Sequence, residues 1–226
     1  ARTEGGATAR TLRAAGANVA LAPVLDVARP GGAIEREGRA LGATAGAVAR
    51  VGTAFVAGLQ DGAVAATAKH FPGFGAATLN TDDGAAVVGL PASTLRRVDA
   101  APFAAAVRRG VRMVMLASAT YPALSPLPAA LSARVVRGEL RRRLGFAGVT
   151  VSDDLETPAF ARFGGAPGAA VRAARAGVDV LLCAQTYAGA DRAARAVAAA
   201  LREGALDRRE LEDGARRVLR ARAALR

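Results

Sequence analysis

The sequence predicts an α/β protein with a parallel sheet. Short apolar segments alternate with longer helical ones, and the apolar segments are uninterrupted, as expected for parallel strands that are covered on both faces. Each apolar segment also ends in a small group of polar residues. The carboxyl ends of parallel strands meet at one edge in a barrel and in an open doubly wound sheet alike, so this pattern leaves both architectures open.

Five segments are expected to be strands because each is short, apolar and free of breaks. They are residues 18–22, 64–68, 112–117, 149–152 and 178–183. The polar residues that follow them, in the same order, are Asp26, the pair Lys69-His70, Ser118, the pair Asp153-Asp154, and Gln185. An eight-stranded barrel takes about 250 residues, so five strands indicate either a smaller fold or a chain without its first strands.

The segments between and after these strands are expected to be helices. They are residues 7–15, 43–60, 94–109, 132–144, 168–176, 191–203 and 207–226. The chain of 226 residues can bury one substantial core, and no Ser-rich or Pro-rich stretch divides it. We therefore expect a single domain over residues 1–226.

The formal net charge of +12 has a plain explanation in coding bias and solvated helix faces. The arginines at 141–143 and from 208 to 226 are mixed with acidic residues at helical spacings, and aromatic residues make up only 4% of the chain. Recognition of nucleic acid favours a basic stripe with stacking side chains. No nucleic-acid partner is therefore expected, although a basic surface could attract anionic polymers such as cell-wall material.

Several other classes of function lack support in the sequence. No stretch approaches the roughly 18 apolar residues of a membrane span, and no signal peptide is recognised. One histidine, one cysteine and scattered carboxylates give no metal-ligand spacing, and no glycine fingerprint or Walker loop points to a cofactor. Cys183 has no partner for an internal disulfide and is expected to be a buried structural thiol. The compartment, cytoplasm or cell envelope, and the oligomeric state stay open.

The only lysine and the only histidine of the chain are neighbours, Lys69 and His70. They follow an apolar run and precede Phe71-Pro72-Gly73, a turn that proline stiffens and glycine opens. A stiff turn fixes where the two side chains point, so this pair is a candidate site. The alternative is a solvated strand end.

The adjacent carboxylates of Asp153 and Asp154 follow a buried strand directly, and a strand end is a rigid place for a nucleophile or base. The alternative is a helix N-cap, which needs only one carboxylate. The polar loop 80–84 could equally be a plain turn or part of a site. Arg36 and Arg39 could each bind a hydroxyl pair, and the residues alone do not decide between them.

Together these segments resemble the N-terminal catalytic domain of glycoside hydrolase family 3, and most closely its bacterial β-N-acetylhexosaminidase branch. The matching segments are 12–18 (LRAAGAN), 22–27 (APVLDV), 69–73 (KHFPG), 144–149 (LGFAGV), 151–155 (VSDDL), 176–181 (AGVDVL) and 216–219 (RRVL). Their order and spacing also agree with the family. The resemblance implies a TIM-like (β/α)8 barrel that lacks its first strands in this chain, so that residues 1–226 form an N-terminally incomplete catalytic domain.

The resemblance also implies roles for particular residues. Asp153 matches the nucleophile of a retaining glycosidase, Lys69 and His70 match residues that bind sugar hydroxyls, and Arg39 matches a substrate-binding arginine. Attack by Asp153 would give a glycosyl-enzyme ester that water then opens. A nearby Lys69 would favour the ionised form of that carboxylate.

One departure from the family concerns the acid. The hexosaminidase branch carries an Asp-Ser-His triplet in the loop after KHFPG, and its histidine acts as acid and base, whereas the aligned residues here are Asn80, Thr81 and Asp82. His70 is the only histidine of the chain and already matches a sugar-binding position, so no histidine remains to act as acid and base. Three outcomes stay open: Asp82 or Asp83 acts as the acid, another domain supplies it, or the protein binds sugar and cleaves it poorly. We expect a hydrolase of β-linked N-acetylglucosamine in peptidoglycan fragments, with Asp82 as acid and base. A β-glucosidase-like member of the family and a weakly catalytic carbohydrate-binding relative are the alternatives.

Overall fold

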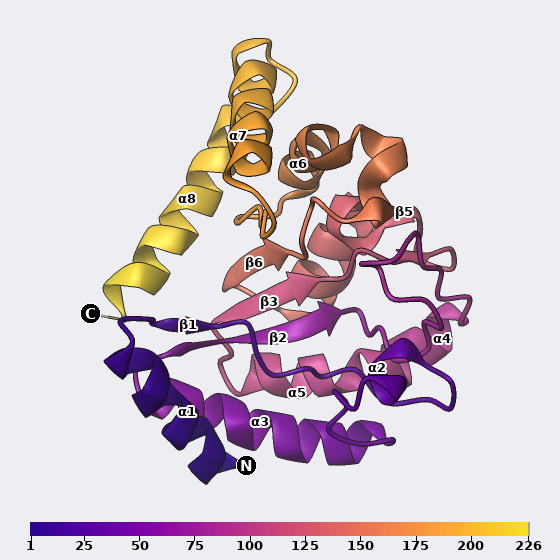
Figure 1. Ribbon diagram of the computed structural model, residues 1–226, viewed down its shortest axis with the longest axis vertical. Helices are drawn as coiled ribbons and strands as arrows, with labels where there is room; N and C mark the ends of the chain where they lie inside the picture. The colour runs from indigo at the N-terminus through magenta and orange to yellow at the C-terminus, as the bar shows by residue number, and fades with distance from the viewer. Residues whose placement is uncertain (226) are drawn as a thin grey trace.

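A computed structural model describes residues 1–225, which form a parallel sheet surrounded by helices (Figure 1). Four strands lie side by side in chain order: β1 (Val19–Ala20), β2 (Ala65–Phe71), β3 (Met113–Leu116) and β6 (Val149–Ser152). Val19 pairs with Ala65, and Met113 pairs with both Thr67 and Val149. The predicted α/β class with a parallel sheet is confirmed.

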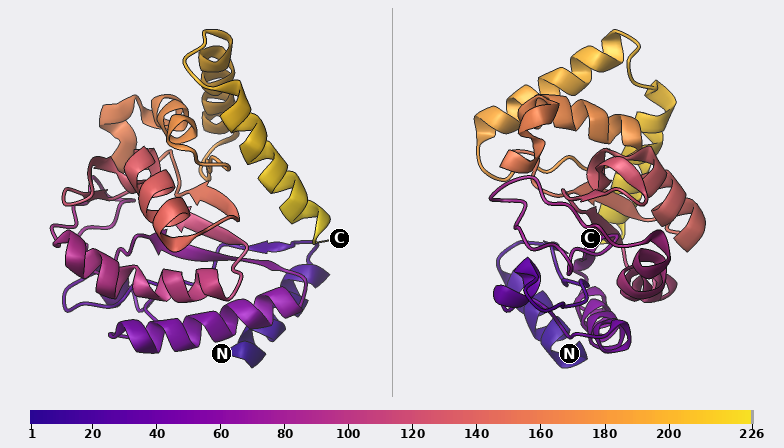
Figure 2. Two further views of the ribbon diagram at one scale, coloured as in Figure 1. Left: turned by 180° about the vertical axis from the view of Figure 1, so that it is seen from behind. Right: turned by 90° about the vertical axis from the view of Figure 1, so that its right-hand side faces the viewer.

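Helices cover the sheet in two groups, which Figure 2 shows from two further sides. The first group comprises α1 (Arg2–Ala14), α3 (Ala45–Asp61) and α5 (Ala101–Arg108), and the second comprises α6 (Gly165–Ala176), α7 (Tyr187–Arg202) and α8 (Arg208–Ala223). The other helices are α2 (Ala33–Arg36), α4 (Ala92–Thr94), two of π type (Leu95–Asp99, Arg134–Arg143) and two of 3-10 type (Ala129–Leu131, Pro158–Phe163). A small hairpin of β4 (Thr120–Tyr121) and β5 (Ser125–Pro128), which the sequence did not predict, follows β3.

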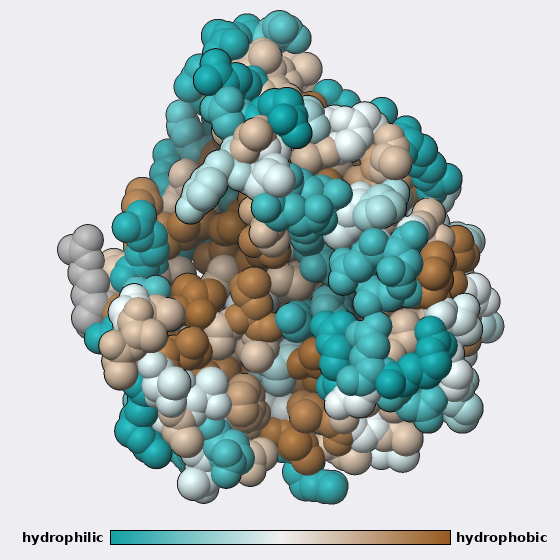
Figure 3. Space-filling view, in the orientation of Figure 1, coloured by the Kyte–Doolittle hydropathy of each residue, from teal (hydrophilic) through white to brown (hydrophobic). Residues whose placement is uncertain are grey.

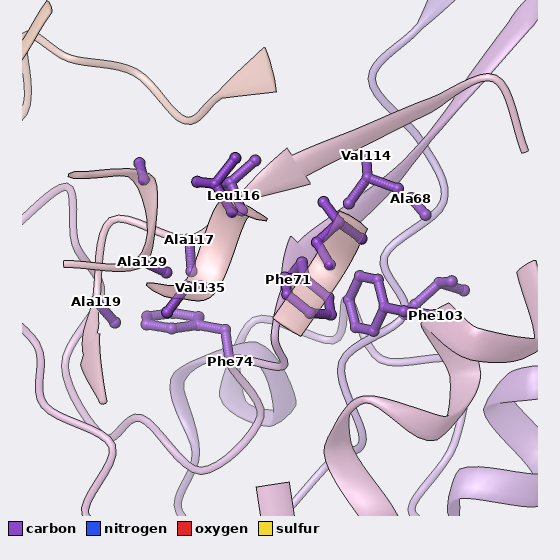
Figure 4. Packing of buried hydrophobic residues seen from close by; sticks show 14 of the residues in the cluster. Ala68, Phe71, Phe74, Phe103, Val114, Leu116, Ala117, Ala119, Ala129 and Val135 are labelled. Carbon is purple, nitrogen blue, oxygen red and sulfur yellow. The ribbon is translucent and has the colours of Figure 1, made fainter. Parts of the chain in front are cut away.

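The two faces of the sheet belong to different apolar clusters, because successive side chains of a strand point to opposite faces. Val114 and Leu116 of β3 pack in the large cluster beneath the helices, together with Phe71 and Phe103 (Figure 4). The rings of these two phenylalanines meet edge to face, with their centroids 5.4 Å apart. The opposite face of the sheet, which is called its inner face below, packs in a smaller cluster of Ala65, Met113, Met115, Val149, Val151 and Leu225.

Four of the five predicted strands differ in extent from the structure. β1 and β3 are shorter than the predicted 18–22 and 112–117, and the other two differ more. β2 continues past the predicted 64–68 to Phe71, because the Lys69 amide donates to the Pro23 carbonyl (3.1 Å) and the Leu25 amide donates to the Lys69 carbonyl (2.6 Å). The predicted segment 178–183 lies beside β6 in the sheet but does not form a full strand. It is joined to β6 by a single β-bridge, between Val151 and Val180. Lys69 and His70 therefore lie inside a strand and not after it.

Helices α1 and α7 begin earlier than predicted, at Arg2 instead of residue 7 and at Tyr187 instead of residue 191. Glycine disfavours helices, but a Cβ at Gly5 would lie 2.4 Å from the Phe55 carbonyl oxygen of α3, so glycine there permits close helix packing. At α7 the Thr186 hydroxyl caps the helix by accepting from the Gly189 amide (2.9 Å).

The inner face of the sheet is partly open. In Figure 3 apolar side chains gather around the hollow between α8 and β1. Val19 of β1 and the nearby Leu21 are 36% and 40% exposed. At the end of α8 the Arg13 guanidinium donates to the Leu225 carbonyl (3.3 Å), which ties this helix to the end of α1. Within residues 1–225 no helix combines the length and apolar character that crossing a bilayer requires.

A buried carboxylate, Asp179, connects three elements of the second half of the chain. Its side chain is 1% exposed and pairs with Arg141 of the π-type helix 134–143 (2.8 Å) and with Arg217 of α8 (2.7 Å). It also accepts from the amide and the hydroxyl of Thr150 in β6, at 2.9 and 3.0 Å. These bonds fix β6 and α8 relative to each other.

Replacement of Asp179 by alanine is expected to lower the free energy of unfolding by about 3–5 kcal/mol, because two arginines lose their buried partner. Chemical denaturation with a fluorescence or circular-dichroism signal measures this change. The exposed pair of Asp191 and Arg195 on α7 provides the control, since Asp191→Ala should leave stability nearly unchanged. Equal effects of the two substitutions would contradict a structural role for Asp179.

Candidate active site

A cavity of about 290 Å³ lies at the carboxyl ends of β2, β3 and β6. Its wall contains the five residues for which the family resemblance and the loop after KHFPG suggested roles, from four separate parts of the chain: Arg39, Lys69, His70, Asp82 and Asp153. Apolar side chains also line it, among them Met115 of β3 and Leu182 of the segment 178–183. Charged groups of both signs therefore meet in one concave surface, which is typical of a small-molecule site.

His70 is held by Asp26, a carboxylate with no exposed surface. The His70 Nδ1 atom lies 2.7 Å from Asp26 Oδ2, and the other carboxylate oxygen accepts from the backbone amides of His70 (3.2 Å) and Phe74 (2.6 Å). The sequence placed Asp26 after the first strand but assigned it no role. Because Nδ1 faces Asp26, the other ring nitrogen, Nε2, remains for a group in the cavity.

The turn that follows His70 is packed so tightly that only glycine fits at two positions. Gly73 has a φ of +126°, and a Cβ there would lie 2.6 Å from the Asp99 Cβ atom; a Cβ on Gly75 would lie 1.9 Å from the Val27 carbonyl oxygen. The buried Tyr121 hydroxyl donates to the Gly73 carbonyl (3.1 Å). The stiff turn predicted from Phe71-Pro72-Gly73 therefore depends on distant contacts as well as on proline.

Lys69 and Arg39 bring positive charge to the cavity. Burial lowers the pKa of the Lys69 ammonium, as does the Arg39 guanidinium, while Asp153 and Asp26 raise this pKa. Arg39 Nη1 pairs with Glu37 (2.8 Å). Arg36, the alternative to Arg39 in the sequence, turns away and donates to the backbone carbonyls of Gly31 and Thr78, so of the two arginines only Arg39 lines the cavity.

The two adjacent carboxylates at the end of β6 have different surroundings. Asp153 is fixed through its backbone amide, which donates to the Leu116 carbonyl of β3 (3.1 Å), and its Oδ1 accepts from the Asp154 amide (3.0 Å). Asp154 accepts from the amides of Glu156 and Ala184 (both 3.1 Å) and from the Gln185 side chain (3.0 Å). The alternative of a helix N-cap is wrong, because the next helix begins only at Pro158 and has Thr157 as its N-cap residue. Both aspartates line the cavity, but the Asp153 carboxylate has one bond, from the neighbouring amide, whereas Asp154 has three.

Asp82 lies on the loop between β2 and α4, opposite the strand ends. Partial burial raises the pKa of its carboxyl, and the negative charges of Asp153 and Asp154 raise it further, while Arg39 opposes them. The Asp82 amide donates to the Asn80 side chain (3.1 Å), and the neighbouring Thr81 is buried. The loop 80–84, which the sequence left open between turn and site, contains both features: an Asx-type turn and a carboxyl in the cavity wall.

The structure adds to what the sequence indicated for two further residues, Ser118 and Cys183. Ser118 lines the cavity, and its buried hydroxyl has no hydrogen-bond partner among residues 1–225. Cys183 was expected to be buried but is half-buried, because the segment after Val180 leaves the sheet; burial still raises the pKa of its thiol. Within the described residues, no three His, Cys, Asp or Glu side chains are grouped to hold a metal ion.

Comparison with known proteins gives consistent relatives. The profile described as "Glycosyl hydrolase family 3 N terminal domain" matches residues 1–221. An "Uncharacterized secreted glycosyl hydrolase" of Arthroderma benhamiae is 37% identical over 215 residues, which are 93% of this chain and 61% of that protein. A "Beta-hexosaminidase" of Xylella fastidiosa is 37% identical over 174 residues, 77% of this chain and 51% of that protein. The chain thus spans between half and two thirds of the length of these curated relatives.

Solved structures agree with the sequence comparison. A family 3 β-N-acetylglucosaminidase from a Paenibacillus species superposes on 98% of this chain with a TM-score of 0.94 and 38% identity, the match covering 42% of that protein. A β-N-acetylhexosaminidase from Beutenbergia cavernae superposes on 98% with a TM-score of 0.89 and 34% identity, covering 68% of that chain. The parallel strands described above are thus part of the (β/α)8 barrel fold of these proteins. The chain belongs to glycosyl hydrolase family 3, whose N-terminal domain it matches over residues 1–221.

Proposed function

We propose that this chain carries the site of a retaining β-N-acetylhexosaminidase, with Asp153 as nucleophile and Asp82 as acid and base. The observation that supports this proposal most is the single cavity whose wall contains Asp153, Asp82, Lys69, His70 and Arg39. A cavity of about 290 Å³ has room for one sugar ring. The names of the relatives point to the same activity and to an amino-sugar substrate.

In the first step an Asp153 carboxylate oxygen attacks the anomeric carbon, and the bond from that carbon to the leaving oxygen breaks. The proton on the Asp82 carboxyl passes to the leaving oxygen, so the leaving group departs as an alcohol. The product on the protein is a glycosyl ester of Asp153. The raised pKa of Asp82 suits this step, because its carboxyl keeps a proton to higher pH than an ordinary aspartate.

In the second step the ionised Asp82 takes a proton from water, and the water oxygen attacks the anomeric carbon. The ester bond to Asp153 breaks, which restores both carboxyl groups to their starting states and retains the sugar configuration. Lys69, His70 and Arg39 bind hydroxyl or carbonyl oxygens of the sugar in both steps. Charged hydrogen bonds that strengthen as the ring flattens stabilise the transition state.

The substrate we favour is β-linked N-acetylglucosamine in fragments of bacterial cell wall. A β-glucosidase-like activity is the alternative within the same chemistry. A weakly catalytic sugar-binding protein is the second candidate function, because Asn80, Thr81 and Asp82 stand where the hexosaminidase branch has its Asp-Ser-His triplet. Loss of acid catalysis costs on the order of a hundredfold to ten-thousandfold in rate.

Trapping the ester tests the nucleophile. Incubation with a fluorinated N-acetylglucosaminyl fluoride, whose leaving group needs little acid assistance, should add one glycosyl mass at Asp153, as intact mass and peptide mapping would show. Asp153→Asn should abolish both the adduct and hydrolysis, because an amide is a poor nucleophile. Absence of the adduct in folded protein would favour the sugar-binding alternative.

Substitution of Asp82 tests the acid. Asp82→Asn should slow hydrolysis of an unactivated disaccharide by about a hundredfold or more, and that of a dinitrophenyl glycoside much less, because only the former needs a proton on its leaving group. In the unsubstituted protein kcat/KM for the disaccharide should fall as pH rises through the raised pKa of Asp82, and this fall should disappear in the variant. Equal losses on both substrates would remove Asp82 from the acid role.

A further inference from the structure

A carboxylate outside the cavity, that of Glu37, connects two parts of its wall. Glu37 follows α2, and its Oε2 atom accepts from Arg39 Nη1 at 2.8 Å. Its Oε1 atom accepts from the Asn80 side-chain amide at 2.7 Å. Arg39 and Asn80 line the cavity, but Glu37 does not. One carboxylate thus bridges a cationic residue and the loop that carries Asp82.

The bridge continues to Asp82 through Asn80. The Asn80 side-chain oxygen accepts from the Asp82 amide (3.1 Å), and the Asn80 backbone carbonyl accepts from the Asp83 amide (3.1 Å). With its amide group on Glu37 and its oxygen on Asp82, Asn80 has both ends of its side chain engaged. The position of the Asp82 backbone therefore depends on where Glu37 lies.

The loop has few other restraints. Residues 76–85 belong to no strand or helix, Asp83 is exposed, and Asp82 is only partly buried. Arg36 donates to the Thr78 carbonyl (2.8 Å), and Thr81 is buried. Side-chain contacts from the α2 segment therefore help to position the Asp82 loop. Asp153, by contrast, is positioned by the pairing of β3 with β6, because it directly follows β6.

Glu37 also determines which carboxylate pairs with the Arg39 guanidinium. Without this partner the Arg39 guanidinium would have the carboxylates of Asp82, Asp153 and Asp154 within the same cavity as alternatives. Pairing with Asp82 would favour the ionised form of that carboxyl, which has no proton to give to the leaving group. The bond from Arg39 lowers the pKa of Glu37, so Glu37 stays charged under ordinary conditions.

We propose that Glu37 is a positioning residue that holds Arg39 and the Asp82 loop at a fixed spacing, and that it does so through Asn80. This inference rests on the proposed hydrolase function. It adds a residue that touches neither substrate nor reacting atoms. It also gives Asn80 a role: the amide that replaces a carboxylate in this loop donates to Glu37, which an aspartate could not do.

A double-mutant cycle tests the bridge. Glu37→Ala and Asn80→Ala should each lower kcat/KM for an unactivated disaccharide by about tenfold, the effect of losing one charge-assisted hydrogen bond, and the double variant should lose little more. Hydrolysis of a dinitrophenyl glycoside should change less in all three, because it needs no acid. Additive losses, or equal losses on both substrates, would overturn the proposal.

The pH profile gives a second readout that a merely structural role would not change. Asp82 faces Asp153, Asp154 and Asp83, which raise its pKa, and Arg39, which lowers it; Lys69 and His70 lie in the same wall. Release of Arg39 from Glu37 should therefore move the fall of kcat/KM at high pH to lower pH in Glu37→Ala. An unchanged profile would contradict the charge-directing part of the proposal.

Glu35 on α2 provides the matched control. Its carboxylate accepts from the Gly31 amide (2.9 Å) and lies outside the cavity wall, so Glu35→Ala should leave both substrates within about twofold of the original rates. Adduct formation at Asp153 separates the two hypotheses. If the original protein forms no adduct, the proposed function fails; if it forms the adduct and the Glu37 variant hydrolyses the disaccharide normally, only the bridge fails.

Discussion

The buried carboxylate of Asp26 is the constraint on which the site depends. A charge without exposed surface is costly unless hydrogen bonds replace water, and three bonds from His70 and Phe74 meet this need. Each bond to a charged group contributes about 1.5–3 kcal/mol. Asp26 therefore fixes both the end of β2 and the orientation of the His70 ring. The tight turn at Gly73 and Gly75, and the place of Lys69 in the wall, follow from that fixed strand end.

Much of the fold could be predicted from the sequence, because parallel strands buried on both faces leave long apolar runs. The strand 149–152 has its predicted bounds, and the helices between strands were found in order. The starts of α1 and α7 could not be predicted, because they depend on tertiary contacts. Glycine at position 5 is favourable only where another helix backbone approaches, and Thr186 acts as a cap only where the chain turns. The short hairpin β4–β5 lacks any long apolar run.

Site residues could be predicted where a residue type that suits catalysis or binding is also rare or unusually placed in the chain. The only lysine and histidine of the chain, and the paired aspartates after β6, were distinctive in the sequence, and the fold brings them to one cavity. The contributions of Asp26, Tyr121 and Glu37 could not be predicted, since each depends on a partner distant in sequence: 44 residues separate Asp26 from His70, and 43 separate Glu37 from Asn80. That Asp153 and Asp82 act as nucleophile and acid stays a prediction.

The network around Asp179 has a consequence for how the second half of the chain opens. The Thr150 amide in β6 donates to the Asp179 carboxylate, and the same carboxylate holds Arg217 of α8. Detachment of α8 would leave this carboxylate without one of its arginines, so helix and strand form one cooperative unit of local unfolding. Exchange of the Thr150 amide hydrogen with solvent thus reports on the docking of a helix near the end of the chain, although that amide lies three residues before the proposed nucleophile.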